Sequence, residues 1–278
     1  MASNPTPPPT QRIYRHRLPV RVMHWINLIS VTLLLMSGLN IFNAHPALYW
    51  GHDSKFASPW LSISARDGAG GPIGVTRIAG IEWDTTGVLG LSHADGRLYA
   101  RGFPGWATVP GAQGLAVARR WHFFFAWVFV VNGVAYLIYS LFSRHLTRDL
   151  LPTPAELRSI GSSIKNHLLL RHPSGDAAKR YNVLQMLTYL GVIFGLLPML
   201  VVAGLAMSPR LDTVYTGWVD LLGGRQSARS LHFIAASGLL LFTAVHLFEV
   251  VVAGAWNEMR SMVTGWYKLP ADKAREGL

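Results

Sequence analysis

Four long apolar runs dominate the chain, and charged, Gly-rich and Pro-rich stretches separate them. The runs cover residues 19–42, 121–142, 183–207 and 231–255. A helix needs about 20 residues to cross the hydrocarbon core of a bilayer, and in lipid its backbone amides must be satisfied within the segment. The pattern therefore predicts an all-α integral membrane protein built as a four-helix transmembrane bundle.

The remaining segments lie around and between these runs. Residues 1–18 are an N-terminal arm and residues 256–278 a C-terminal tail, on either side of a transmembrane domain of residues 19–255. Residues 43–118 form a long loop between the first two runs. Loops of this length are usually functional, so we predict that this one is a docking surface for another protein.

The long loop contains its own structural signals. Turns rich in Gly and Pro occupy residues 67–74 and 103–111. Residues 80–84 and 96–99, between these turns, resemble short strands or turns.

Two further signals concern the first helix and the segment before the third run. The first run is longer than a signal-peptide core and follows a Pro-rich, then Arg-rich arm, so we expect it to be a retained anchor. Thr153, Pro154 and Glu156 match a capping box with proline at the first helical position. This match predicts a surface helix that extends to about Leu170.

Composition supports a membrane protein, and the distribution of charge indicates its orientation. Only 14% of the residues are charged, whereas soluble domains carry about 25%. Of the 25 Lys and Arg residues, 15 lie in the arm with the start of the first run, in residues 143–180 and in the tail. Cytoplasmic segments are enriched in Lys and Arg, so we predict cytoplasmic termini, a cytoplasmic surface helix and an outer loop at 43–118. The net charge of +11 then reflects topology rather than nucleic-acid binding.

The chain contains no cysteine. This absence excludes an iron–sulfur cluster held by thiolates, a covalently attached c-type haem and any disulfide within the chain. Any bound metal must be held by His, Met or oxygen ligands.

Four of the eleven histidines lie inside the apolar runs: His24, His122, His232 and His246. Ionisable residues in membrane helices usually face the bundle interior and mark functional sites. The other histidines lie in the arm and loops, where we expect solvated surface side chains: His16, His45, His52, His93, His145, His167 and His172.

The four histidines fall at two depths. With the N-terminus inside, His122 and His232 share an outer level, whereas His24 and His246 share an inner one. His232 and His246 are 14 residues apart, about four helical turns or 21 Å, so they face the same way. Two imidazoles from different helices are a known axial ligand set for haem iron, whereas zinc takes four ligands. Gly38 follows His24 by 14 residues and leaves space at the outer level, although small residues also serve plain helix packing.

Three arginines each precede a proposed ligand by three residues: Arg21, Arg119 and Arg229. This offset places a guanidinium on the ligand's face of the helix, one turn nearer the surface. Arginine pairs well with carboxylates, so we predict that these residues bind haem propionates. The alternative is that they extend to the lipid headgroups.

Several motifs carry a family resemblance: His24-Trp25, Arg120-Trp121-His122-Phe123, Lys179-Arg180-Tyr181-Asn182 with Gln185, Gly223-Gly224-Arg225-Gln226-Ser227-Ala228-Arg229 with His232, and Trp256-Asn257-Glu258-Met259-Arg260. In these motifs and their order, the chain resembles the bacterial cytochrome b561 and Ni/Fe-hydrogenase cytochrome b superfamily. It is most similar to the cytochrome b subunits of thiosulfate-reductase type.

The resemblance implies two haem b groups, with His24 and His246 binding the cytoplasmic-side iron and His122 and His232 the periplasmic-side iron. It also implies the bacterial inner membrane and a quinone pocket beside the inner haem. Asn182 and Gln185 are expected in this pocket, although they can also simply cap a helix.

Glu249 lies one turn from His246 toward the cytoplasm. We hypothesise that it moves the protons of quinone chemistry; the alternative is an interior carboxylate paired with an arginine such as Arg21.

The favoured function is therefore an electron-transfer subunit that connects the quinone pool to a periplasmic redox partner, by resemblance a molybdopterin oxidoreductase. One alternative is a stand-alone cytochrome b561 oxidoreductase that uses a small oxidant such as superoxide. A second is a non-haem transporter in which the histidines bind metal or carry protons.

Overall fold

The computed structural model describes residues 11–94, 96–169, 180–215 and 217–269. Parts of the sequence-based predictions lie outside these ranges. They are the first ten residues of the arm, the predicted helix end at Leu170, the loop histidine His172, and the basic residues Arg171, Lys179, Lys273 and Arg275.

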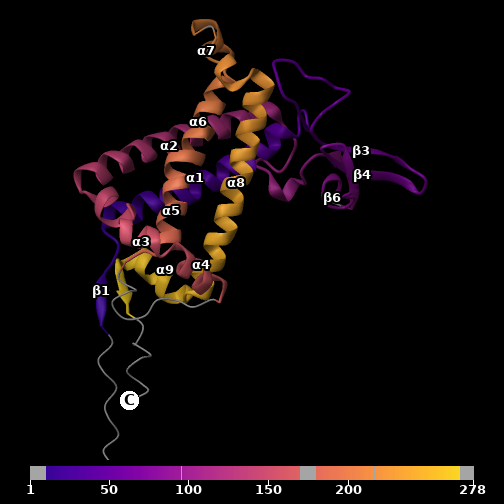
Figure 1. Ribbon diagram of the computed structural model, residues 1–278. Helices are drawn as coiled ribbons and strands as arrows, with labels where there is room; N and C mark the ends of the chain where they lie inside the picture. Colours follow the sequence, from indigo (N-terminus) through magenta and orange to yellow (C-terminus); the bar gives the residue numbers. More distant parts are fainter. Residues whose placement is uncertain (1–10, 95, 170–179, 216, 270–278) are drawn as a thin grey trace, which may run out of the picture. The chain divides into compact units, whose positions relative to one another are not determined.

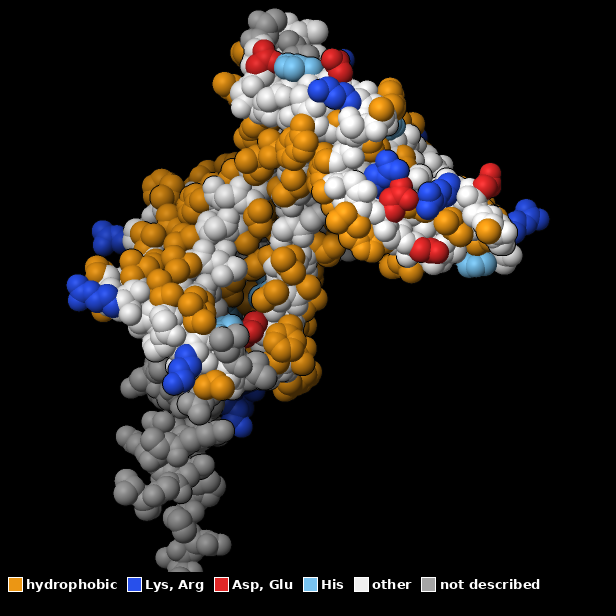
Figure 2. All heavy atoms as spheres, turned by 45° about the vertical axis from the view of Figure 1, so that its right-hand side comes forward, with side chains coloured by type: hydrophobic (Ala, Val, Ile, Leu, Met, Phe, Trp, Pro, Cys, Tyr) orange, Lys and Arg blue, Asp and Glu red, His pale blue; other side chains and the backbone are white. Residues whose placement is uncertain are grey.

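Within the described residues, four helical spans are long and apolar enough to cross a membrane, as the sequence predicts (Figure 1). They are α1 (Leu18–Phe42), α2 (Leu115–Phe142), a third span over Val183–Ala206, and α8 (Arg225–Val252). Figure 2 shows apolar side chains gathered over the surface of the long helices. Such an apolar outer surface is what a lipid environment requires, because lipid tails contact it without cost.

Two of the spans begin before their apolar runs. Helix α2 starts at Leu115 and α8 at Arg225, six residues ahead of the runs at 121 and 231. The apolar runs exclude these first turns because they carry residues such as Arg119 and Arg229. As a result, His122 and His232 are each the eighth residue of their helix rather than its start.

The third span is not a uniform α-helix. It consists of α5 (Val183–Gly191), a π-helical turn at Val192–Leu196 and α6 (Leu197–Ala206). Pro198 lies in the first turn of α6. Because proline has no N–H and its ring crowds the carbonyl four residues earlier, the helix widens into a π turn just before it.

The chain divides into two compact units, which we describe separately. One contains residues 1–25, 134–195 and 239–278, and we call it the arm unit. The other contains residues 26–133 and 196–238, and we call it the loop unit.

In the arm unit, residues near the two ends of the chain pair with each other. Strand β1 (Arg12–Tyr14) pairs antiparallel with β8 (Trp266–Lys268), which follows helix α9 (Ala255–Thr264). Arg15 forms an ion pair with Glu258 of α9 at 3.5 Å, and its guanidinium lies 4.5 Å from the ring centre of Tyr267. These contacts hold the start of α1 against the segment that follows α8.

The predicted surface helix is two helices rather than one. They are α3 (Pro154–Arg158) and α4 (Ile160–Leu168), preceded by a π-helical turn at Leu146–Leu150. The capping box is present, since Glu156 N donates to Thr153 Oγ1 at 3.3 Å and Thr153 N donates to Glu156 Oε2 at 2.7 Å. The break falls at Ser159, whose hydroxyl donates to the Glu156 carbonyl at 2.7 Å, a local bond that competes with helix continuation.

In the loop unit, the long loop folds largely as β-structure, so the all-α prediction holds for the spans and not for this segment. One sheet has the order β2-β3-β4-β5 and a second pairs β6 with β7. The strands are β2 (Ala47–Leu48), β3 (Leu61–Gly68), β4 (Gly71–Ile78), β5 (Ile81–Asp84), β6 (Gly90–Ala94) and β7 (Arg97–Arg101).

The strand signals at 80–84 and 96–99 correspond to β5 and β7, and the turn signal at 67–74 lies at the tip of the β3–β4 hairpin. Short helices follow at Gly105–Ala107, α7 (Pro209–Val214) and Asp220–Leu222.

Two asparagines attach this loop to the end of α1. Asn40, fully buried, donates through Nδ2 to the carbonyls of Pro110 and Ala112 at 2.7 and 3.0 Å. Asn43 donates to the Phe103 carbonyl at 3.1 Å and accepts from Phe103 N at 2.6 Å. Because buried amides must find partners, these bonds fix the loop in register with the helix.

The same loop also satisfies the N-terminus of α8. The Gly51 carbonyl accepts from Gln226 N and Ser227 N at 3.0 and 3.2 Å, which supplies partners for helix-terminal amides that otherwise have none. Gly224 lies directly against Gly51: a Cβ at Gly224 would be 2.6 Å from the Gly51 carbonyl carbon, and its φ is +101°. The contact therefore requires glycine.

We predict that Gly224→Ala lowers the free energy of unfolding by about 1–3 kcal/mol, because the side chain meets the Gly51 backbone and the residue is strained at positive φ. Thermal unfolding of the purified protein measures this loss. Gly70→Ala is the control, since nothing lies within 4 Å of its added Cβ. An unfolding midpoint equal to that of the control would contradict the prediction.

Candidate haem and quinone sites

The loop unit brings His122 of α2 and His232 of α8 face to face. Their ring centres are 6.1 Å apart, and the ring planes are inclined at 63°. The two histidines occupy equivalent positions, since each is the eighth residue of its helix. The fold therefore brings two imidazoles close together, although more than one hundred residues separate them in the sequence.

Backbone carbonyls of neighbouring helices hold both rings. His122 Nδ1 lies 3.1 Å from the Leu34 carbonyl of α1, and His232 Nδ1 lies 2.9 Å from the Leu200 carbonyl of α6. A carbonyl can only accept, so Nδ1 carries the proton in both rings. The other nitrogen, Nε2, is then the unprotonated one and is available as a metal ligand.

A glycine one turn after each carbonyl makes this approach possible. A Cβ at Gly38 would lie 3.4 Å from His122 Cε1, and a Cβ at Gly204 would lie 3.4 Å from His232 Cε1. Helical side chains tilt toward the N-terminus and cover the turn before them. Glycine four residues after Leu34 or Leu200 therefore leaves that carbonyl accessible to an imidazole.

The sequence indicates Gly38 at this level, as predicted from its spacing to His24, whereas Gly204 and Leu200 were not predicted. The signal was present as a short repeat: Leu34-Leu-Met-Ser-Gly38-Leu in the first span and Leu200-Val-Val-Ala-Gly204-Leu in the third. Its meaning becomes clear only when the histidine that contacts each copy is known.

The arm unit contains the second pair. The ring centres of His24 in α1 and His246 in α8 are 6.4 Å apart, again with planes inclined at 63°. Phe242 stacks on His246 at 5.8 Å and 20°. Trp25, beside His24, donates through Nε1 to the Met262 carbonyl of α9 at 3.1 Å. The aromatic neighbours restrict the orientation of both imidazoles.

The two separations fit a metal held between the rings. An imidazole nitrogen lies about 2 Å from a bound metal and about 1.2 Å from its ring centre. Two rings on opposite sides of one ion therefore have centres about 6.3 Å apart, close to the 6.1 and 6.4 Å observed. Among the described residues, no group of three or more His, Asp or Glu side chains is gathered for a metal ion, so each pair offers two protein ligands, a number compatible with a bis-histidine haem.

The three predicted propionate arginines differ in their surroundings. Arg21 donates to the Val263 carbonyl, and its buried Nε has no hydrogen-bond partner within the described part of the chain. Arg229 donates to the His45 carbonyl and lies 5.7 Å from the Phe42 ring centre. Arg119 is exposed and lies over Phe123.

Arg260 of α9, which was not predicted to bind a propionate, resembles Arg21 in one respect. Its buried Nε also has no partner among the described residues, although Nη2 donates to Asn257 Oδ1 at 2.6 Å. Buried donors of this kind need an acceptor, and a propionate would supply one.

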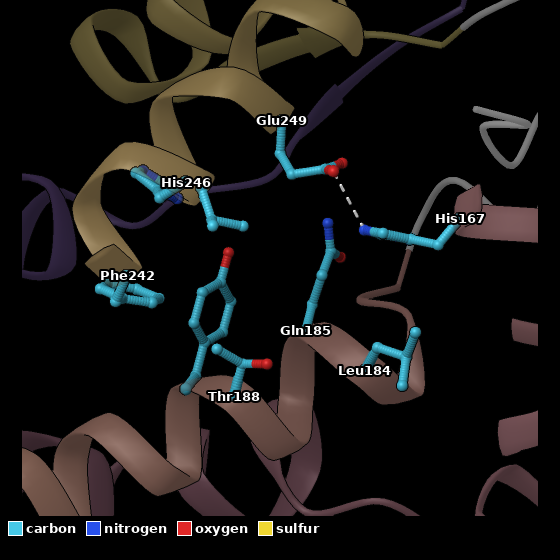
Figure 3. Close-up of a pocket in the computed structure, with 9 residues that line it drawn as sticks. His167, Leu184, Gln185, Thr188, Phe242, His246 and Glu249 are labelled. Atoms are coloured by element: carbon cyan, nitrogen blue, oxygen red, sulfur yellow. Dashed lines mark ion pairs between the residues drawn. The ribbon is translucent and has the colours of Figure 1, made fainter. Parts of the chain in front are cut away.

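A pocket beside His246 contains most of the residues predicted for quinone chemistry. Figure 3 shows Gln185 pointing from α5 toward Glu249 and His167, with Thr188 on the same helix and Phe242 near His246. Leu184, Tyr189 and Val245 also line the pocket. The pocket therefore combines an amide, a carboxylate, two imidazoles and aromatic walls.

Glu249 pairs with His167, at 3.2 Å between Oε1 and Nε2, and not with Arg21. Arg21, the arginine named in the alternative, is therefore not the partner of Glu249, and the pairing also corrects the expectation that His167 is an ordinary solvated side chain. Sequence gave no signal for it, because His167 lies at the end of α4 in a segment without membrane character.

Asn182 and Gln185 form the N-terminal cap of α5. Asn182 Oδ1 accepts from Leu184 N at 3.0 Å, and Gln185 Oε1 accepts from Asn182 N at 3.1 Å. Gln185 also lines the pocket, whereas the Asn182 side chain is not among its lining residues. The preceding Tyr181 is an unionised phenol, because burial raises its pKa.

His16 is buried, which corrects the expectation of a solvated surface side chain. Burial and the neighbouring Arg15 lower the pKa of His16 to about 4. The imidazole is therefore neutral at physiological pH.

The chain belongs to the prokaryotic cytochrome b561 family, whose sequence pattern matches residues 15–265. It is thus a multi-pass membrane haem protein of electron transfer, as the sequence motifs indicated. A relative in Azospira oryzae is named as YedZ1, a subunit of a protein-methionine-sulfoxide reductase. The two chains are 28% identical over 244 residues, which cover 87% of this chain and 93% of the relative. No solved structure matches the chain.

We predict that Asn182→Ala destabilises the protein by about 1 kcal/mol, whereas Asn182→Ser has a much smaller effect, because serine also accepts a helix-terminal amide. Thermal unfolding of the two variants measures the difference. Equal destabilisation by both would show that the cap is not the main structural role of Asn182.

Proposed function

We propose that this protein is a di-haem b-type cytochrome subunit that transfers electrons between the quinone pool and a periplasmic redox partner. The observation that carries the proposal is the pair of ring-centre separations, 6.1 and 6.4 Å, each matching two imidazoles on one iron. Two such pairs imply two haems per chain. When bound, each haem provides a one-electron carrier.

In this proposal the chain's own groups position each cofactor. His122 and His232 bind the periplasmic-side iron through Nε2, since their Nδ1 protons point at carbonyls. His24 and His246 bind the cytoplasmic-side iron.

Arg21, Arg119 and Arg229 neutralise propionates. Arg21 Nε, which has no partner among the described residues, supports this role, whereas the assignment of the exposed Arg119 rests on its spacing from His122.

The pocket lined by Gln185, His167 and Glu249 supports a quinone site in the arm unit. The Gln185 amide is a hydrogen-bond donor suited to a quinone carbonyl. The Glu249–His167 pair offers a carboxylate and an imidazole, two groups suited to exchanging the protons that accompany quinone oxidation or reduction. Asn182 contributes by holding the first turn of α5, and with it Gln185, in place.

The topology and partner follow from charge and from the loop. We propose cytoplasmic N- and C-termini in a bacterial inner membrane, which places residues 43–118 in the periplasm. The named relative is a subunit of a reductase, and this supports a subunit role here too. A periplasmic oxidoreductase of the molybdopterin type, docked on the β-structured loop, is the partner we propose.

A reduced-minus-oxidised visible spectrum with haem quantified per chain tests the proposal. We expect two b haems in the unaltered protein and about one in His122→Ala or His24→Ala, because each variant removes one of the two histidines that would hold one haem. His93→Ala, at an exposed strand position, should retain both. A folded protein without haem would contradict the proposal. It would favour a transporter in which the same histidines bind metal or carry protons.

We predict that Glu249→Gln slows haem reduction by a quinol analogue at least about tenfold, because it removes a proton-exchanging group. Stopped-flow spectroscopy measures the rate, and the dithionite-reduced spectrum should not change. Glu82→Gln, in β5, is the control carboxylate. An unaltered quinol rate in Glu249→Gln would remove the proton role and leave the haem assignment intact.

A further inference from the structure

The ligands His122 and His232 contact the same backbone motif on α1 and α6, but the two copies differ at one residue. Ser37 precedes Gly38 in α1, whereas Ala203 precedes Gly204 in α6. Both residues are fully buried. Ser37 Oγ lies 3.1 Å from His122 Nδ1, a contact that Ala203 cannot make to His232.

The direction of this hydrogen bond follows from which of the two atoms carries a proton that is free to be donated. His122 Nδ1 also lies 3.1 Å from the Leu34 carbonyl, which can only accept, so Nδ1 carries the proton. The Ser37 hydroxyl directs its own proton to the Leu33 carbonyl at 2.5 Å. Ser37 Oγ therefore accepts, and the Nδ1 proton of His122 is shared between two oxygens. Among the described residues, the Nδ1 proton of His232 has one acceptor, the Leu200 carbonyl.

We propose that Ser37 makes His122 the stronger electron donor of the two ligands and thereby lowers the reduction potential of the iron they hold; this inference rests on the proposed haem function. A second acceptor draws the Nδ1 proton outward and raises the basicity of the imidazole at Nε2. A more basic ligand stabilises the oxidised iron more than the reduced iron. Ser37 is thus a tuning residue that acts through His122 and does not contact the iron.

Redox titration of paired variants tests the inference. His24→Ala serves as the background, since it should retain only the haem held by His122 and His232. In that background, we expect Ser37→Ala to raise the midpoint potential by up to about 59 mV. This shift corresponds to a tenfold change in the equilibrium constant of the one-electron reduction. Ala203→Ser is the matched variant, because it places a hydroxyl at the equivalent position beside His232, and it should lower the potential.

The outcomes separate this inference from the proposed function. Opposite shifts in the two variants would support it, since a general loosening of the site would not produce both signs. A potential unchanged or lowered in Ser37→Ala, with haem retained, would overturn the tuning role alone. A background protein that binds no haem at all would instead overturn the proposed function. If Ala203→Ser fails to bind haem, the sign measured in Ser37→Ala still decides.

Discussion

The structure depends on one constraint: an imidazole inside an apolar bundle must satisfy its second nitrogen without water. Helix carbonyls are the only abundant acceptors there, and each already accepts a bond from its own helix. A carbonyl has a second lone pair, but the side chain one turn later usually covers it. Glycine at positions 38 and 204 removes that cover, so Leu34 and Leu200 can each hold a histidine.

The β-structured loop, which lies outside the spans, also helps to hold the ligand-bearing helices in place. Its segments attach to α1 through Asn40 and Asn43 and to the first turn of α8 through Gly51. These contacts fix the helix ends that precede or follow the ligands by a few turns. Within the loop unit, the loop is therefore part of the framework of the site, in addition to any role it has in docking a partner.

Sequence could predict the parts of this architecture that depend on local chemistry. Apolar runs gave the four spans, and the rarity of histidine in lipid singled out the four residues that form two pairs. Capping chemistry at Thr153 gave the start of α3 correctly, because it involves neighbours in the chain. The turns at 67–74 and the strands at 80–84 and 96–99 were visible for the same reason.

What sequence could not give were contacts between distant segments. Gly204 is an ordinary small residue until His232 is placed against it, and the pairing of His167 with Glu249 joins residues that no local pattern connects. Helix starts were also set too late at α2 and α8, since hydropathy marks where a helix becomes apolar rather than where it begins. From the sequence, Asn182 could either cap a helix or contribute to a quinone pocket. The structure identifies Leu184 N as its capping partner.

Helix α8 contains one histidine of each pair. The number of residues from His232 to His246, which is 14, therefore sets their relative orientation on the helix. Inserting or deleting a single residue in this stretch would turn one imidazole by about 100° relative to the other. We therefore expect natural variation in this stretch to proceed by substitution, with its length held fixed. Hairpin tips such as that between β3 and β4 have no such restriction, so the family's differences in chain length should accumulate in the loop and not in this helix.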